Sequence, residues 1–221
     1  MKSFLLTTIV LLSFLSLQAF PSHWWEKVPE DQRKGSWEIL PQEAGPGELV
    51  LSKRNELGQF SNLAATAFEF QGERFASVEA LWQMMKYPEE GNIKDHRVKH
   101  FSDYPYSRDQ VKQLSGFTAK KAGNKANAIN QKYFSDKKNL SYRSFFFDYK
   151  DMAEGSKFHY QIISAAIKEK VLQNPKLLDL LLSTKDLILV PDHKMGKNRP
   201  RSYYYNQILM DIRSSYQLKE K

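Results

Sequence analysis

The stretch QFSNLAATAFEFQGERFASVEALWQMMK, from Gln59 to Lys86, decides how this chain folds. Apolar and polar residues alternate on both sides of a Gln-Gly pair in Phe68–Phe75, a pattern that predicts an antiparallel hairpin. Ser77 is a favourable N-cap residue, and apolar residues at helical spacing follow it until Pro88. The sequence therefore predicts a hairpin that leads directly into a helix.

The remaining segments predict more helix than strand. The Lys- and Asn-rich segment 111–131 has a helical pattern that we expect to break around Gly116 and Gly123. Further helices are predicted for residues 159–174, 175–184 and 203–217, and a short strand for residues 188–192. Few strands among many helices indicate an α+β domain.

Composition excludes several classes of protein. The chain has 221 residues, of which 41% are hydrophobic and 26% charged, as is typical of one well-buried globular domain. It has no Cys, which excludes disulfides, Cys-ligated zinc or iron–sulfur sites and a thiol nucleophile. We expect no cofactor and no metal.

The first 19 residues have the layout of a signal peptide. Lys2 precedes an apolar run from Phe4 to Leu17, which is too short to span a membrane comfortably. We expect export to the periplasm or the medium, cleavage after Ala19 and no stable membrane span afterwards. The predicted organisation is a signal peptide at 1–19, an irregular lead-in at 20–47 and one domain at 48–221.

The charge balance is basic, with 33 Lys and Arg against 25 Asp and Glu and a formal net charge of +8. A basic chain favours an anionic partner such as a phosphate-bearing small molecule or a nucleic acid. The same balance also occurs in exported proteins where it only serves solubility. The sequence leaves both interpretations open, and it does not predict an oligomeric state.

Three polar residues of the predicted helix share one face. Gln83 and Lys86 follow Glu79 by four and seven residues, and an α-helix has about 3.6 residues per turn. A carboxylate, an amide and an amine therefore point together at a polar surface or a cleft. The alternative is an ordinary solvated face, with Glu79 placed in the first turn because the helix dipole favours a carboxylate there.

The same stretch resembles the opening signature of the NADAR family, also called YbiA-like. The matching positions are Phe60, Ser61, Asn62, Gly72, Ser77, Glu79, Gln83 and Lys86. Later segments follow the family order too, including Ala122-Gly123 and the closing helix at Ile208–Arg213. The resemblance covers about 160 residues and implies a single, mainly helical α+β domain with a small antiparallel β element.

The resemblance also implies an activity, because family members hydrolyse N-glycosidic bonds of ribose-phosphate or ADP-ribose derivatives. It makes Glu79 and Lys86 the catalytic residues, with Glu79 as the carboxylate near the sugar. Lys86 then either binds phosphate or attacks C1 as a neutral amine. The implied substrate-binding residues are Ser61, Asn62, Gln83, Gly123, Asp192 and Gly196.

The chain departs from the family pattern at several positions. Ala80 replaces a His, Met195 replaces a Trp, and Arg201–Asn206 differs from the family's Gly-rich step. Two alternatives therefore stay open. One is a non-catalytic protein that binds a nucleotide or nucleic acid on the same fold, and the other is an exported effector or toxin that acts on nucleotides.

Overall fold

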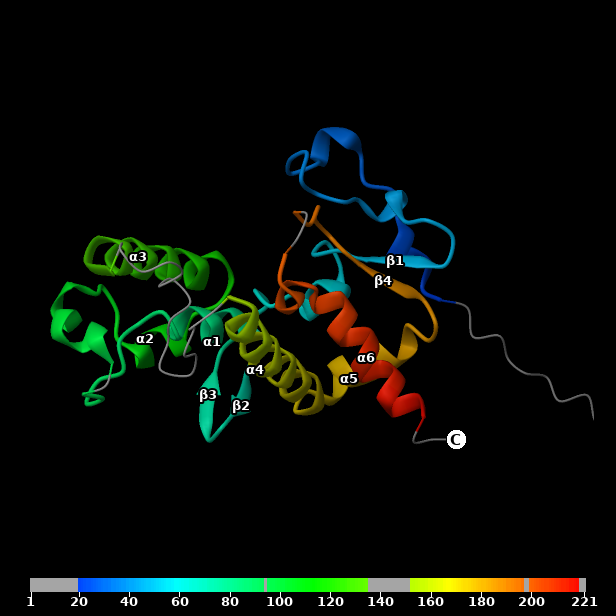
Figure 1. The fold of residues 1–221 in the computed structure, drawn as a ribbon. Helices are drawn as coiled ribbons and strands as arrows, with labels where there is room; N and C mark the ends of the chain where they lie inside the picture. Colours follow the sequence, from blue (N-terminus) through cyan, green and yellow to red (C-terminus); the bar gives the residue numbers. More distant parts are fainter. Residues whose placement is uncertain (1–19, 94, 135–151, 197–198, 219–221) are drawn as a thin grey trace, which may run out of the picture.

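The computed structural model describes residues 20–93, 95–134, 152–196 and 199–218, and most of them are helical (Figure 1). The α-helices are α1 (Val78–Met84), α2 (Arg108–Lys112), α3 (Gly116–Phe134), α4 (Met152–Leu172), α5 (Pro175–Ser183) and α6 (Tyr205–Gln217). Short 3₁₀ helices lie between them: η1 (Ser22–Trp25), η2 (Glu30–Gln32), η3 (Pro41–Glu43), η4 (Glu56–Phe60), η5 (His96–Asp103) and η7 (Arg201–Tyr203). The strands are β1 (Glu48–Leu51), β2 (Phe68–Phe70), β3 (Glu73–Phe75) and β4 (Ile188–Pro191).

The four strands form two separate pairs. Strands β2 and β3 are antiparallel, with Phe68 opposite Phe75, as the sequence predicted. Strands β1 and β4 are parallel, with Glu48 opposite Ile188, and the sequence analysis did not anticipate this pairing. The parallel pair joins the early part of the chain to the segment that precedes α6 (Figure 1). The fold class is thus the expected α+β, mainly helical, with a small antiparallel element.

Helix α1 begins where its capping residue predicts. The Ser77 hydroxyl accepts a hydrogen bond from the backbone N–H of Ala80 at 3.0 Å and donates one to the carbonyl of Leu114 at 3.1 Å. Unlike a one-sided amphipathic helix, α1 is buried nearly all round, because α2, α3, α4 and β3 all pack against it. Gln83 and Lys86 are 6% and 7% exposed, so the polar face of this helix lies inside the protein.

Helix α3 runs through Gly123 without a break, so the predicted interruption there is wrong. A Cβ atom built on Gly123 would lie 1.5 Å from Oε1 of Gln83. The glycine is therefore required by the close approach of α3 to the Gln83 side chain rather than by a turn. Gly116, where a break was also expected, is the first residue of the helix and has a φ of +59°.

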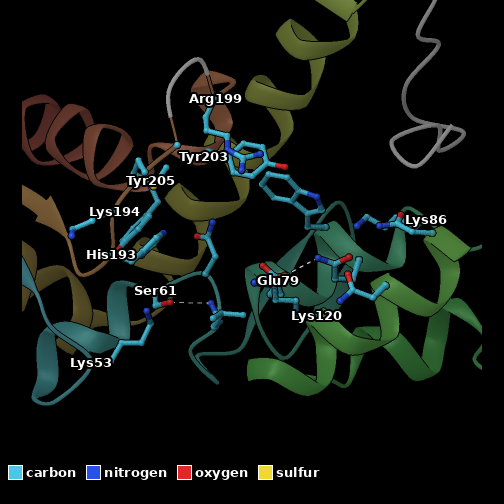
Figure 2. A pocket seen from close by; sticks show the side chains of 18 residues that line it. Lys53, Ser61, Glu79, Lys86, Lys120, His193, Lys194, Arg199, Tyr203 and Tyr205 are labelled. Carbon is cyan, nitrogen blue, oxygen red and sulfur yellow. Dashed lines mark hydrogen bonds between the residues drawn. The ribbon is translucent and has the colours of Figure 1, made fainter. Parts of the chain in front are cut away.

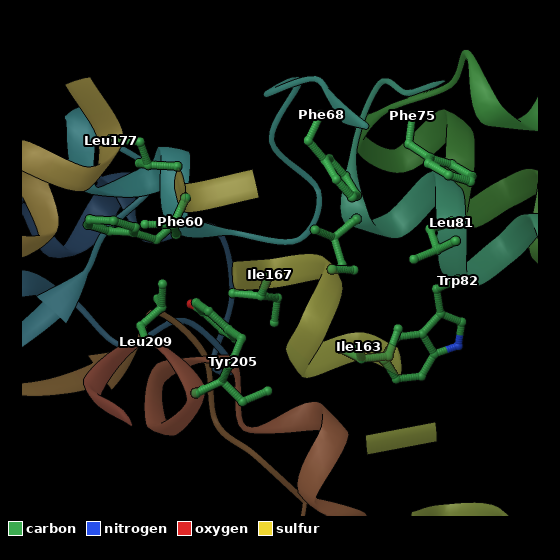
Figure 3. Packing of buried hydrophobic residues seen from close by; sticks show 14 of the residues in the cluster. Phe60, Phe68, Phe75, Leu81, Trp82, Ile163, Ile167, Leu177, Tyr205 and Leu209 are labelled. Carbon is green, nitrogen blue, oxygen red and sulfur yellow. The ribbon is translucent and has the colours of Figure 1, made fainter. Parts of the chain in front are cut away.

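Helix α4 lies at the centre of the hydrophobic core. Figure 3 shows its Ile167 between Leu81 of α1 and Leu209 of α6, and all three are buried. The irregular lead-in also contributes, since Trp24 is buried in the same core and its Nε1–H donates to Oε1 of Glu56 at 2.6 Å. Residues 20–47 thus pack onto the domain that follows.

Some expectations concern residues outside the described ranges, namely the predicted signal peptide at 1–19 and the aromatic run at 145–147. Within the ranges that are described, none of the helices combines the length and the apolar character needed to cross a membrane.

Candidate active site

A cavity of about 450 Å³ lies between the α1–α3 pair and the segment that follows β4 (Figure 2). Its first wall comes from α1, from Lys86 just after it and from α3: Glu79, Trp82, Gln83, Lys86, Lys120, Asn124 and Asn127. The second wall comes from the β4–α6 connection and the start of α6: His193, Lys194, Met195, Gly196, Arg199, Tyr203 and Tyr205. Lys53 and the loop residues Ser61, Asn62 and Leu63 complete the lining.

Six of the eight residues singled out from the sequence line this cavity: Ser61, Asn62, Glu79, Gln83, Lys86 and Gly196. The other two lie behind its walls. Gly123 makes room for Gln83, as described above. Asp192 is 4% exposed and binds Lys53 and His193, which themselves line the cavity. Gly123 and Asp192 are thus next to lining residues but are not in the lining itself.

Glu79 and Gln83 form a hydrogen-bonded pair one turn apart. The Nε2–H of Gln83 donates to Oε1 of Glu79 at 2.7 Å. The amide oxygen of Gln83 is thereby turned away from Glu79, and it is buried without a hydrogen-bond partner in the described part of the chain. Burial raises the pKa of Glu79, although the hydrogen bond from Gln83 and the charges of Lys86 and Lys120 oppose the shift.

Lys86 lies on the same wall and is almost completely buried. Burial lowers the pKa of its ammonium to about 8; the charge of Glu79 opposes this shift and that of Lys120 adds to it. Among the described residues, no carboxylate forms a salt bridge with Lys86, and its side chain is part of the cavity lining. About one amine in ten is then neutral at pH 7, since each pKa unit is a tenfold change.

The loop that carries Ser61 and Asn62 is fixed from two sides. Lys170 of α4 donates from Nζ to the backbone carbonyls of Gln59 at 2.6 Å and Ser61 at 2.8 Å. The carbonyl of Asn62 in turn accepts the backbone N–H of Glu79 at 2.9 Å. Oδ1 of Asn62 is buried and has no partner in the described structure. The loop therefore couples α4 to the first turn of α1.

The sequence analysis assigned no role to Lys170, which lies within the predicted helix at 159–174. A signal existed, because Lys170 stands on the otherwise apolar face that includes Ile163 and Ile167. Burial lowers the pKa of Lys170 to about 7. A Lys at such a position needs acceptors inside the protein, and here they are loop carbonyls of the cavity wall.

Positive charge dominates the cavity lining. Lys53 is paired with Asp192 at 2.6 Å, whereas Lys120 of α3 and Lys194 and Arg199 of the β4–α6 connection add further charge. Lys120 and Lys194 were missed because they are far apart in sequence and follow no common period. The arrangement suits an anionic ligand, since Glu79 is the one carboxylate in the described lining.

One aromatic ring from each wall meets the other where the two walls of the cavity join. The Trp82 and Tyr203 rings meet edge to face, with centroids 4.9 Å apart at 79°. The guanidinium of Arg199 lies over the Tyr203 ring at 5.6 Å, and all three residues line the cavity. A flat heterocyclic base has faces on which such rings can pack.

Comparisons with known proteins find a likeness to a solved structure but not to a family model. No protein-family model matches the chain, and no curated protein matches it at a significant level. Among solved structures, the NMR structure of the E. coli protein YbiA is similar, with a TM-score of 0.48 and 19% sequence identity. The match covers 76% of this chain and 83% of that one.

The lining offers acid–base and nucleophilic groups rather than a metal site. Within the described residues no group of three or more His, Asp or Glu side chains is arranged to hold a metal ion. What the cavity does bring together is a carboxyl group with a raised pKa, an amine with a lowered pKa and several cations. Such a set suits proton transfer and covalent attack on an anionic substrate.

Proposed function

We propose that this protein is an N-glycosidase of the NADAR type, acting on a ribose-phosphate or ADP-ribose derivative. The observation that carries the proposal is the opening of Glu79 and Lys86 into one cationic cavity, each with a pKa shifted by burial. The matching positions of the Gln59–Lys86 motif support the same activity.

The lowered pKa of Lys86 favours a role as nucleophile over a role as fixed positive charge. In the proposed reaction the neutral Nζ attacks C1 of the ribose, and the C1–N bond breaks with its electron pair passing to the leaving base. The sugar ring then opens to a Schiff base on Lys86, and water hydrolyses it to release the sugar and the amine. Glu79 supplies a carboxyl group beside the sugar, where positive charge develops in the transition state.

The other lining residues fit the rest of such a substrate. Asn62 lines the cavity, and its side-chain oxygen, which has no partner in the described structure, is the acceptor we assign to a ribose hydroxyl, whereas Oε1 of Gln83 packs against Gly123. Lys120, Lys194 and Arg199 attract phosphate, and the Trp82 and Tyr203 rings face a base. If the chain is exported, as residues 1–19 predict, its substrates are extracellular nucleotides rather than cytosolic riboflavin intermediates.

The test is release of a free base from a panel of substrates by the purified full chain. The panel contains ADP-ribosylated guanosine, guanosine 5′-phosphate, nicotinamide dinucleotide and riboflavin precursors, with chromatography as readout. We expect Lys86→Ala and Glu79→Gln each to lower kcat/KM at least about a hundredfold, the usual scale for such groups. Lys121→Ala is the matched control, because Lys121 is an exposed residue of α3 outside the cavity lining.

Circular dichroism and the melting temperature check that each variant is folded. Binding of panel members without any turnover would contradict the proposed enzyme and favour the non-catalytic nucleotide-binding alternative. Equal activity of the Lys86→Ala variant and the wild type would remove Lys86 from the mechanism.

A further inference from the structure

Asp192 and His193, directly after β4, form a carboxylate–imidazole pair at the second wall of the cavity. Nδ1 of His193 lies 2.9 Å from Oδ1 of Asp192. Lys53 donates to both oxygens of the same carboxylate, at 2.8 and 2.6 Å. Burial alone would raise the pKa of Asp192, but the hydrogen bonds from His193 and Lys53 outweigh it and hold the pKa below its usual range.

The pairing fixes which nitrogen of His193 faces a ligand. An ionised carboxylate only accepts hydrogen bonds, so Nδ1 of His193 must carry a hydrogen. Asp192 is buried behind the cavity wall, whereas His193 is one of the lining residues, with its side chain 37% exposed. Nε2, on the opposite edge of the ring, is therefore the nitrogen left for exchange of a proton with a bound molecule.

The backbone around this pair is also held in place. The carbonyl of Asp192 accepts the N–H of Ile39 at 2.9 Å, and the N–H of Lys194 donates to the carbonyl of Trp37 at 2.8 Å. His193 and Glu38 form an antiparallel bridge between these two bonds. The lead-in thus anchors the residues on both sides of His193, as a positioned acid or base requires.

On the basis of the proposed function, we infer that His193 is the catalytic acid that protonates the leaving base and that Asp192 is its positioning residue. Glu79 and Lys86 lie on the first wall of the cavity and His193 on the second (Figure 2). In this proposal the sugar of a substrate between the walls faces Glu79 and Lys86, and its base faces His193. His193 therefore serves the base side of the substrate, whereas Glu79 and Lys86 serve the sugar side.

The step balances in atoms and charge. As Nζ of Lys86 forms its bond to C1, the C1–N electron pair moves to the ring nitrogen of a purine, which takes the proton from Nε2 of the His193 imidazolium. The water that hydrolyses the sugar–lysine bond gives its oxygen to C1 and returns a proton to the imidazole. The net reaction is hydrolysis to a free purine and a ribose phosphate.

Two substrates that differ in their need for a proton provide the test. Guanine must be protonated as it leaves guanosine 5′-phosphate, whereas the N7-methylated form already carries a positive charge and leaves as a neutral base. We expect His193→Gln to lower kcat/KM at least about a hundredfold for guanosine 5′-phosphate and less than about threefold for the methylated form. Asp192→Asn should show the same preference with a smaller loss, because it releases the imidazole from its fixed tautomer.

His23→Gln is the matched control. His23 is also hydrogen-bonded to a carboxylate, with Nε2 2.7 Å from Oε1 of Glu56, but it is absent from the cavity lining. The His23→Gln variant should have the same kcat/KM as the wild type for both guanosine substrates. A merely structural role of His193 would lower both rates equally, and this result would overturn the inference.

The remaining outcomes separate this inference from the proposed function. A wild-type chain that releases bases from other panel members but from neither guanosine substrate overturns the role of His193 alone. A wild-type chain that cleaves only the methylated form also overturns it, since no acid would then be acting. A chain that releases no base from any substrate overturns both.

Discussion

Replacement of Gly123 by Ala should destabilise the protein through one specific neighbour, the Gln83 side chain. The added Cβ would lie 1.5 Å from Oε1 and 2.3 Å from Cδ of Gln83, so the amide must leave its present place. Gln83 is 6% exposed and donates to Glu79 at 2.7 Å, so its displacement breaks this hydrogen bond inside a packed interface.

The magnitude follows from three opposing contributions. A lost hydrogen bond to a charged group costs about 1.5–3 kcal/mol, and overpacking costs about 1–3 kcal/mol. Ala is favoured over Gly inside a helix by about 1 kcal/mol, which offsets part of the loss. We expect Gly123→Ala to lower the free energy of unfolding by about 2–4 kcal/mol. In a Gln83→Ala background the obstacle is gone, and the same change should stabilise the protein by about 0.5–1 kcal/mol.

Urea unfolding of the four proteins in this cycle measures the coupling between the two positions. A reversal of sign between the two backgrounds and a coupling energy of about 2.5–5 kcal/mol are expected. Equal effects of Gly123→Ala in both backgrounds would refute this expectation, because the glycine would then be required for some reason other than Gln83.

Three further predictions concern pH and processing. Because burial lowers the pKa of Lys86 to about 8 and its neutral form is the nucleophile, kcat/KM for the N7-methylated substrate, which needs no acid, should rise with pH through about 8 and then level off; a fall across this range would indicate phosphate binding by the ammonium. Burial lowers the pKa of Lys170 from 10.5 to about 7, so the unfolded chain binds the extra proton between these values, and the free energy of unfolding should rise with pH over that window. Urea titrations should show a smaller rise for Lys170→Met, and an unchanged slope would contradict the assignment. If residues 1–19 are a signal peptide, mass spectrometry of exported protein should find a mature N-terminus near Phe20, and an intact Met1 would exclude cleavage.

The parts of the fold that the sequence predicted are those that depend on neighbours in the chain. The hairpin turn needs positive φ at Gln71 and Gly72, 52° and 78°, and the Gln-Gly pair provides a residue suited to it. The start of α1 depends on the Ser77 hydroxyl and the N–H three residues later. Such short-range requirements select particular residue types, which can be recognised in the sequence.

The parts that were missed depend on residues far apart in the chain. The parallel pairing of β1 with β4 joins segments about 140 residues apart. No sequence feature of either strand indicates which strand it pairs with. From sequence alone, Gly123 predicts a helix break. The structure shows instead that the Gln83 side chain occupies the space that a Cβ atom at position 123 would need. The common face of Glu79, Gln83 and Lys86 was predictable from helical spacing. On the facing wall, the family resemblance pointed to Asp192 and Gly196, but His193 was not assigned a role.

Reductive trapping tests the central claim most directly. Borohydride added while the full chain turns over a ribose-phosphate N-glycoside should reduce the Schiff base and leave a ribose phosphate on the peptide that contains Lys86, as detected by mass spectrometry. The Lys86→Arg variant should give no adduct, because its guanidinium stays protonated and cannot attack C1. Turnover without any adduct, or an adduct on the neighbouring Lys120 instead, would contradict the account.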